Sequence, residues 1–154
     1  MRRVLLNVAY VVRRFTFKLL RWSTRGVRVM AFDPEGRLLL VRHGYGRREL
    51  WMLPGGGIGR RETPDEAARR ELMEEARCGS AALTSLGEYR STEEGRLDTV
   101  FLFRGETRDE PQPDRWEVEE ARFFALDALP SQTSPATLRR IAELRGLRKR
   151  DSEW

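Results

Sequence analysis

A short stretch of the chain carries clear signals for the start of a helix. Residues 56–78 read GGIGRRETPDEAARRELMEEARC. Thr63 is of the type preferred at an N-cap, Pro64 suits the first helical position, and Glu66 completes a capping box three residues after Thr63. These signals predict a helix over Pro64–Ala76. Because the start of the helix is fixed, its faces can be assigned.

Three glutamates gather on one side of this predicted helix. Glu71, Glu74 and Glu75 stand at positions i, i+3 and i+4, so their carboxylates cluster. Glu71 and Glu75 form a like-charge pair, which costs roughly 0.2–0.5 kcal/mol in an isolated helix. A hard divalent cation would offset that repulsion, because carboxylates, waters and substrate phosphates are the usual ligands of Mg²⁺.

A salt-bridged surface helix is the competing interpretation. Three pairs at i, i+4 spacing support it: Asp65–Arg69, Glu66–Arg70 and Arg70–Glu74. On the helix alone, both interpretations remain open. The upstream glycines Gly55, Gly56 and Gly57 favour the metal site, since they let the backbone approach the helix and offer carbonyl oxygens to a cation.

The whole segment resembles the signature of the Nudix hydrolases. Gly56 is followed after five residues by Glu62, and after seven more by Arg70-Glu71-Leu72-Met73-Glu74-Glu75-Ala76. Leu53–Gly57 also resembles the family's strand-to-loop junction, and Val118–Pro130 resembles its last strand and following turn. The resemblance covers roughly residues 26–130. It implies an α+β fold, namely a Nudix-type α/β/α sandwich with a mixed β-sheet.

The resemblance also implies a reaction and a cofactor. Nudix hydrolases cleave a diphosphate linkage in a nucleoside diphosphate derivative, with Mg²⁺ (or Mn²⁺) neutralising phosphate charge and lowering the pKa of a bound water. The implied metal ligands are three carboxylates and a backbone carbonyl: Glu71, Glu74, Glu75, and Gly55 or Gly56. Glu62 and Arg70 are the implied supporting pair, which fixes the loop against the helix.

The reaction needs a carboxylate that removes a proton from the attacking water. Family members take this base from the helix or from a later loop. The candidates here are four glutamates: Glu71, Glu75, Glu117 and Glu120. Glu117 ranks slightly ahead of Glu120 because it precedes the last predicted strand, although a solvated loop acid describes it equally well.

Several side chains outside the signature are candidates for binding the substrate. Arg42, Arg47 and Arg48 would hold phosphate, although a solvated basic loop explains them equally well. Tyr45 and Trp51 would stack on a base, and Trp51 also suits the core. His43, the only histidine, is interpreted as a polar residue at a strand end rather than as a base.

The sequence leaves the substrate open. ADP-ribose or a related nucleotide sugar is the default by frequency in the family, although the proline and tyrosine that mark some substrate classes are absent from residues 93–96. The first alternative is an enzyme acting on the 5′ ends of RNA, which would lose affinity steeply with salt. The second is a non-catalytic binding module on the same fold, which the intact carboxylate set disfavours.

One position departs from the family pattern. Arg77 stands where the family usually has a glycine, which ends the helix in a left-handed conformation. Arginine is strained in that conformation, so we expect Gly79 to provide the cap two residues later. The set of carboxylates is unaffected.

Residues 1–25 are predicted to form a separate basic amphipathic helix. Its apolar residues recur at helical spacing: Val4, Val8, Val11, Phe15, Leu19 and Trp22. The segment holds seven cations and no acid, whereas the remainder holds 22 basic and 24 acidic residues. It lacks a signal-peptide cleavage site and a long apolar run. It would therefore contact an anionic membrane surface, nucleic acid, the domain itself or a second subunit of a homodimer.

The remaining pattern predicts one hydrolase domain over residues 26–147 and a basic, polar tail over 148–154. Strands are predicted at 26–32, 37–42, 50–53, 82–90, 97–104 and 118–124. A short helical turn is predicted at 126–129, and a closing helix over Pro135–Leu147 with Leu138, Ile141, Ala142 and Leu144 facing inward. The single cysteine, Cys78, excludes an internal disulfide and favours a reducing, cytoplasmic setting.

Overall fold

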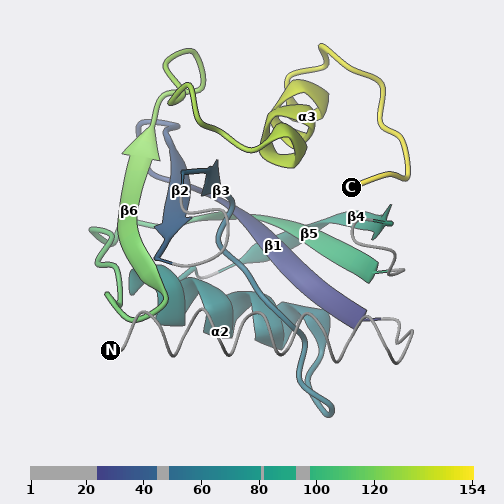
Figure 1. Ribbon diagram of the computed structural model, residues 1–154, viewed down its shortest axis with the longest axis horizontal. Coiled ribbons are helices and arrows are strands. Elements are labelled where there is room, and N and C mark those ends of the chain that lie inside the picture. The colour runs from purple at the N-terminus through teal and green to yellow at the C-terminus, as the bar shows by residue number, and fades with distance from the viewer. Residues whose placement is uncertain (1–23, 45–48, 81, 93–97) are drawn as a thin grey trace.

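The computed structural model describes residues 24–44, 49–80, 82–92 and 98–154 (Figure 1). Its strands are β1 (Thr24–Phe32), β2 (Leu38–His43), β3 (Trp51–Met52), β4 (Leu83–Ser91), β5 (Asp98–Glu106) and β6 (Val118–Phe124). Its helices are α2 (Pro64–Ala76) and α3 (Pro135–Leu144). Residues 1–23 of the predicted amphipathic helix lie outside the described residues. Within the described part, no helix is long and apolar enough to cross a membrane.

The strands form one mixed sheet with the order β3-β2-β1-β5-β4, and β6 pairs with β2. β1 runs parallel to β5 along its whole length. By contrast, β1 meets the antiparallel β2 only where Phe32 pairs with Leu38. The two strands therefore diverge, and the loop that follows β3 fills the opening between them.

The sheet lies between two helical layers, with α2 along one face and α3 over the other (Figure 1). The core beneath α2 includes Val27 and Val29 of β1 with Ala68 and Leu72 of the helix. The core on the other face includes Ile141 of α3 together with residues of β1, β2 and β3. This arrangement confirms the α+β sandwich with a mixed sheet.

Helix α2 begins as its sequence predicts. The hydroxyl oxygen of Thr63 accepts a hydrogen bond from the backbone N–H of Glu66, and the Glu66 carboxylate accepts one from the backbone N–H of Thr63 at 2.8 Å. This reciprocal box satisfies two N–H groups that the helix itself leaves unpaired. With the start fixed, Ala68 and Leu72 face the sheet and are fully buried.

The end of α2 corrects one expectation. Gly79 does not provide the cap, because Arg77 itself adopts the left-handed conformation, with φ 56° and ψ 27°. Its backbone N–H donates to the carbonyls of Leu72 and Met73. The backbone N–H of Gly79 instead donates to the Asp109 carboxylate at 2.8 Å.

Arg77→Gly is expected to raise the free energy of unfolding by about 0.5–1 kcal/mol, because it removes a left-handed strain of roughly 1–2 kcal/mol at some cost in chain entropy. Urea unfolding should show a higher midpoint with an unchanged slope. Arg77→Ala is the matched control, since it removes the same side chain and retains the strain. An equal gain in both variants would contradict this explanation.

The other elements match their predicted ranges closely, with one exception. The segment at 126–129 forms a turn as predicted, with the Ala128 N–H donating to the Ala125 carbonyl at 3.0 Å. Helix α3 ends at Leu144 rather than Leu147, because Gly146 takes a positive φ of 68° just beyond it.

The inward face of α3 also differs from the prediction. Leu138 is 44% exposed and does not face inward, whereas Arg140 is fully buried. The Arg140 guanidinium lies 4.0 Å from the centre of the Tyr89 ring and pairs with Glu143 at 2.9 Å. Arginine is rarely fully buried without such partners. The prediction that Leu138 faces inward was therefore wrong, because Arg140 occupies a position in the core that the apolar pattern did not indicate.

The segment predicted as a tail is attached to the sheet. The backbone N–H of Arg90 in β4 donates to the Ser152 carbonyl at 2.7 Å, and the Trp154 N–H donates back to the Arg90 carbonyl at 2.8 Å. Trp154 packs edge-on against Tyr89 with 5.7 Å between ring centres. These contacts cover the outer edge of β4, which would otherwise expose unpaired backbone groups.

Trp154→Ala is expected to lower the free energy of unfolding by about 1–2 kcal/mol, which is less than for a fully buried tryptophan because the indole is only partly buried. Thermal or urea unfolding measures the change. Glu153→Ala is the control, since its side chain is exposed and should shift stability by less than about 0.5 kcal/mol. Equal stability of the Trp154 variant and the unmodified chain would show that the tail is dispensable.

Candidate active site

The glycine loop after β3 is fastened to β1 by backbone hydrogen bonds. The N–H of Val29 donates to the Pro54 carbonyl and that of Val27 to the Gly56 carbonyl, both at 2.9 Å. Gly55 has a φ of +146°, and a Cβ there would lie 2.1 Å from the Val27 carbonyl oxygen. Only glycine allows this approach, so the loop occupies the opening between β1 and β2 at a fixed position.

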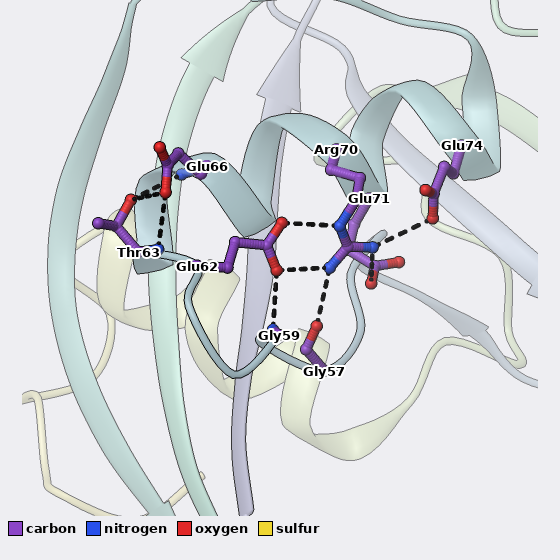
Figure 2. Close-up of polar contacts among 8 residues, drawn as sticks. All are labelled: Gly57, Gly59, Glu62, Thr63, Glu66, Arg70, Glu71 and Glu74. Carbon is purple, nitrogen blue, oxygen red and sulfur yellow. Dashed lines mark hydrogen bonds and ion pairs between the residues drawn. The ribbon is translucent and has the colours of Figure 1, made fainter.

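Glu62 and Arg70 tie this loop to α2 (Figure 2). The Arg70 guanidinium forms two parallel bonds to the Glu62 carboxylate, at 2.7 and 2.9 Å, and donates to the Gly57 carbonyl at 2.9 Å. The hydrogen bond from Arg70 lowers the pKa of Glu62 to about 2, with help from the Gly59 N–H. The structure thus places the predicted supporting pair between loop and helix.

The three glutamates of α2 have different surroundings. Glu71 packs against Gly56 so closely that a Cβ there would lie 2.5 Å from its carboxylate oxygen. The Glu74 side chain is exposed. Arg70 donates a hydrogen bond to the carboxylate of Glu71 at 2.7 Å and another to the carboxylate of Glu74 at 3.1 Å. Glu75 is buried and accepts a hydrogen bond from the Gly55 N–H at 2.8 Å.

Burial dominates the electrostatics of the two inner carboxyls. It raises the pKa of Glu75 to about 8, against the opposing charge of Arg28. It also raises the pKa of Glu71, against the hydrogen bond from Arg70. The negative charges of Glu71 and Glu117 raise the pKa of Glu75 further, to a lesser extent. Glu117 precedes Val118, the cross-strand partner of His43, and His43 contacts Glu75.

These residues fit the chemistry of a hard divalent cation. Glu71 and Glu75 offer carboxylate oxygens beside a loop of backbone carbonyls, and only glycine at position 56 leaves room for the Glu71 carboxylate. In the described part of the chain, however, no three acidic, histidine or cysteine side chains converge on one point. One nitrogen of Arg70 donates to both the Glu71 and the Glu74 carboxylate, so a metal ion that binds both carboxylates has to displace it.

The raised pKa of Glu75 predicts how the metal-free protein responds to pH. The Glu75 carboxyl ionises near pH 4.5 in the unfolded chain and near pH 8 in the folded protein. Between these two pH values only the folded protein keeps the proton on Glu75, so the free energy of unfolding falls as pH rises through this range. The lowered pKa of His43 makes the free energy of unfolding rise with pH, but only below pH 6.5, the pKa of the unfolded histidine. Thermal unfolding in a chelator should therefore show a fall in Tm from pH 6.5 to 8.5.

Glu75→Gln is the matched variant for this measurement, because its amide never ionises. Its Tm should change less over the same pH range. Parallel pH profiles for the variant and the unmodified protein would show that Glu75 does not hold the proton.

The two candidate loop bases have unequal positions. Glu120 pairs with Arg42, its cross-strand partner, and with Arg122, and the bond from Arg42 lowers the Glu120 pKa. Glu117 has an exposed side chain, and its carbonyl accepts a hydrogen bond from the Gly44 N–H at 2.9 Å. The structure thus brings Arg42 and Glu120 together and leaves the Glu117 side chain exposed.

The remaining substrate-binding candidates divide into two groups. Arg47, Arg48 and Tyr45 lie outside the described residues. Trp51 is 8% exposed and packs edge-on against Phe124 at 4.9 Å in the core beside α3, so its ring is committed to the core. The predicted stacking role of Trp51 is therefore not supported by its position.

Sequence reasoning overlooked two side chains beside the site. Trp116, next to Glu117, is 48% exposed, and its backbone N–H is held by the Asp114 carboxylate at 2.9 Å. Arg28 reaches from β1 to the Gly55 carbonyl. An isolated arginine in an alternating strand gives no sign of this contact, because it depends on a loop 27 residues away.

His43 lies at the end of β2 as expected, yet it is buried against the site. Its Nε2 lies 3.5 Å from the Glu75 carboxyl. Burial lowers the pKa of His43 to about 4, with the charge of Arg28 as the next cause. At neutral pH the imidazole is therefore uncharged, and without metal the contact joins two neutral groups.

Comparisons with known proteins place the chain in a family and support its fold. A family model described as NUDIX domain matches residues 22–144. An RNA pyrophosphohydrolase from Bartonella bacilliformis is 40% identical over 144 residues, covering 75% of this chain and 84% of the relative. A putative 8-oxo-dGTP diphosphatase from Bacillus subtilis is 29% identical over 125 residues, covering 79% and 80%. A MutT NUDIX hydrolase from Burkholderia pseudomallei shares the fold, with a TM-score of 0.71, 24% identity, and coverage of 80% and 98%.

Proposed function

This chain belongs to the Nudix family of pyrophosphohydrolases, and we propose that it hydrolyses the 5′-triphosphate end of RNA in a reaction that depends on Mg²⁺ or Mn²⁺. The observation that carries the reaction is the placement of Glu71 and Glu75 against the glycine loop. The choice of RNA rests on the relative from Bartonella, which is named for that substrate and is 40% identical.

The chain's own residues have distinct tasks in this proposal. Glu71, Glu74 and Glu75, with the Gly55 or Gly56 carbonyl, hold the metal ion. When bound, such an ion neutralises phosphate charge and lowers the pKa of a coordinated water. The Glu62–Arg70 pair fixes the loop against the helix, with Arg70 also donating to the Gly57 carbonyl.

Glu117 is the proposed base that takes the proton from the attacking water. Its exposed carboxylate can reach a substrate, and Asp114 fixes its backbone by accepting its N–H at 3.0 Å. Glu120 is the weaker candidate because its carboxylate pairs with two arginines. Glu71 and Glu75 remain the alternatives within the helix.

A competition among substrates tests the proposal. The kcat/KM of the full chain should be at least about tenfold higher for a 5′-triphosphate RNA than for ATP, since ATP lacks the flanking phosphates of the RNA chain. KM for the RNA should rise as salt increases from about 50 to 200 mM. A higher kcat/KM for ADP-ribose, without salt dependence, would instead identify the nucleotide-sugar hydrolase that family frequency suggests.

A further inference from the structure

Arg28 contacts the glycine loop, and the proposed mechanism does not use it. It lies in β1 between Val27 and Val29, both of which pack in the core beneath α2. Its guanidinium donates a hydrogen bond to the carbonyl of Gly55, the loop residue whose own N–H donates to Glu75.

The guanidinium is only lightly engaged. Among the described residues its sole hydrogen bond is the one to Gly55, and no carboxylate lies within ion-pairing distance of it. Arginine carries five N–H donors in a planar fork, so most of its donors have no acceptor within the described part of the chain. Arg70 differs, since its bonds to Glu62, Glu71, Glu74 and Gly57 commit its guanidinium to the protein.

The charge of Arg28 nevertheless acts on the whole site. It opposes the effect of burial on Glu71 and Glu75 and adds to the lowering of the His43 pKa. A positive charge is therefore held next to the position where the diphosphate of a substrate would be cleaved. Planar guanidinium groups bind phosphate through two parallel bonds, which gives both affinity and orientation.

We propose that Arg28 binds a phosphate group of the substrate next to the glycine loop and thereby helps to position the diphosphate for hydrolysis. This inference rests on the proposed function. It identifies a specificity-determining residue outside the signature segment. The competing explanation is a counter-ion that only balances the charge of the buried glutamates.

Binding measurements separate the two explanations without relying on turnover. Methylenediphosphonate, which has a P–C–P bridge that cannot be hydrolysed, serves as the probe in isothermal titration calorimetry with Mg²⁺ present. Arg28→Met should weaken its binding about 10- to 100-fold, and Arg28→Lys should weaken it less because the charge remains while the fork is lost. Arg104→Met on β5 is the matched control, since Arg104 is exposed and stacks on Phe32 away from the glycine loop.

Mn²⁺ titrated alone completes the experiment. A phosphate-binding Arg28 predicts that Arg28→Met binds Mn²⁺ at least as tightly as the unmodified protein, because a repelling charge has gone. Unchanged diphosphonate binding in Arg28→Met, or none in the unmodified protein, would overturn the inference. If Arg28→Met has normal turnover and binds the diphosphonate as tightly as the unmodified protein, the inference about Arg28 is wrong and the proposed function stands. Arg28-dependent binding by a protein that cleaves no substrate would overturn only the function.

Discussion

Glu75→Gln is expected to lower kcat by at least about a hundredfold while the fold stays intact. The carboxylate is buried beside the glycine loop, where the Gly55 N–H donates to it at 2.8 Å. A glutamine oxygen can accept the same hydrogen bond, so the local structure should persist. What the substitution removes is the negative charge that a divalent cation requires.

The matched control for this variant is Asp65→Asn. Asp65 lies in the first turn of the same helix, about half exposed, and pairs with Arg69 at 2.8 Å. It loses the same charge at a distance from the glycine loop, so kcat should change by less than about threefold. Steady-state kinetics with saturating Mg²⁺ measures both variants. Normal kcat in Glu75→Gln and Glu74→Gln would show that the metal assignment is wrong and would favour a binding module.

Gly55→Ala is expected to have the second large effect, this time on the fold. A Cβ at this position would lie 2.1 Å from the Val27 carbonyl oxygen, and φ is +146°. The loop would have to leave β1, and the hydrogen bonds that join them would break. We expect a loss of about 3 kcal/mol or more in the free energy of unfolding, together with loss of activity.

The chain contains its own control two residues away. A Cβ at Gly57 would meet no other atom within 4 Å, and the φ of Gly57 is not positive, so Gly57→Ala should change stability by less than about 0.5 kcal/mol. Urea unfolding of both variants gives the comparison. Equal stabilities would mean that the close contact between Gly55 and β1 does not limit the fold.

The sequence predicts α2 accurately because its start depends on local chemistry. Thr63, Pro64 and Glu66 determine the first turn through contacts within four residues. The resemblance to the Nudix family then places Glu62 and Arg70 in one functional unit, and the structure shows the two side chains in direct contact. The sandwich and the mixed sheet follow from the same family and are confirmed.

Features that depend on distant parts of the chain were harder to predict. The burial of Arg140 depends on contacts with the rings of Tyr89 and Trp154, and Tyr89 lies far away in sequence. The pairing of residues 152–154 with β4 is also non-local. The contact of Arg28 with Gly55 is non-local as well, because the pattern of a strand does not show which distant residues its side chains will contact.

The central claim is that Glu71, Glu74 and Glu75 support metal-dependent hydrolysis of a phosphoanhydride. The most direct test is product formation by the full chain from a panel of 5′-triphosphate RNA, nucleoside triphosphates, nucleotide sugars and dinucleotides, with Mg²⁺ and with a chelator. We predict cleavage of one substrate class that requires the metal and that Glu75→Gln abolishes. Cleavage that persists in the chelator, or none of any substrate with Mg²⁺, would contradict the claim.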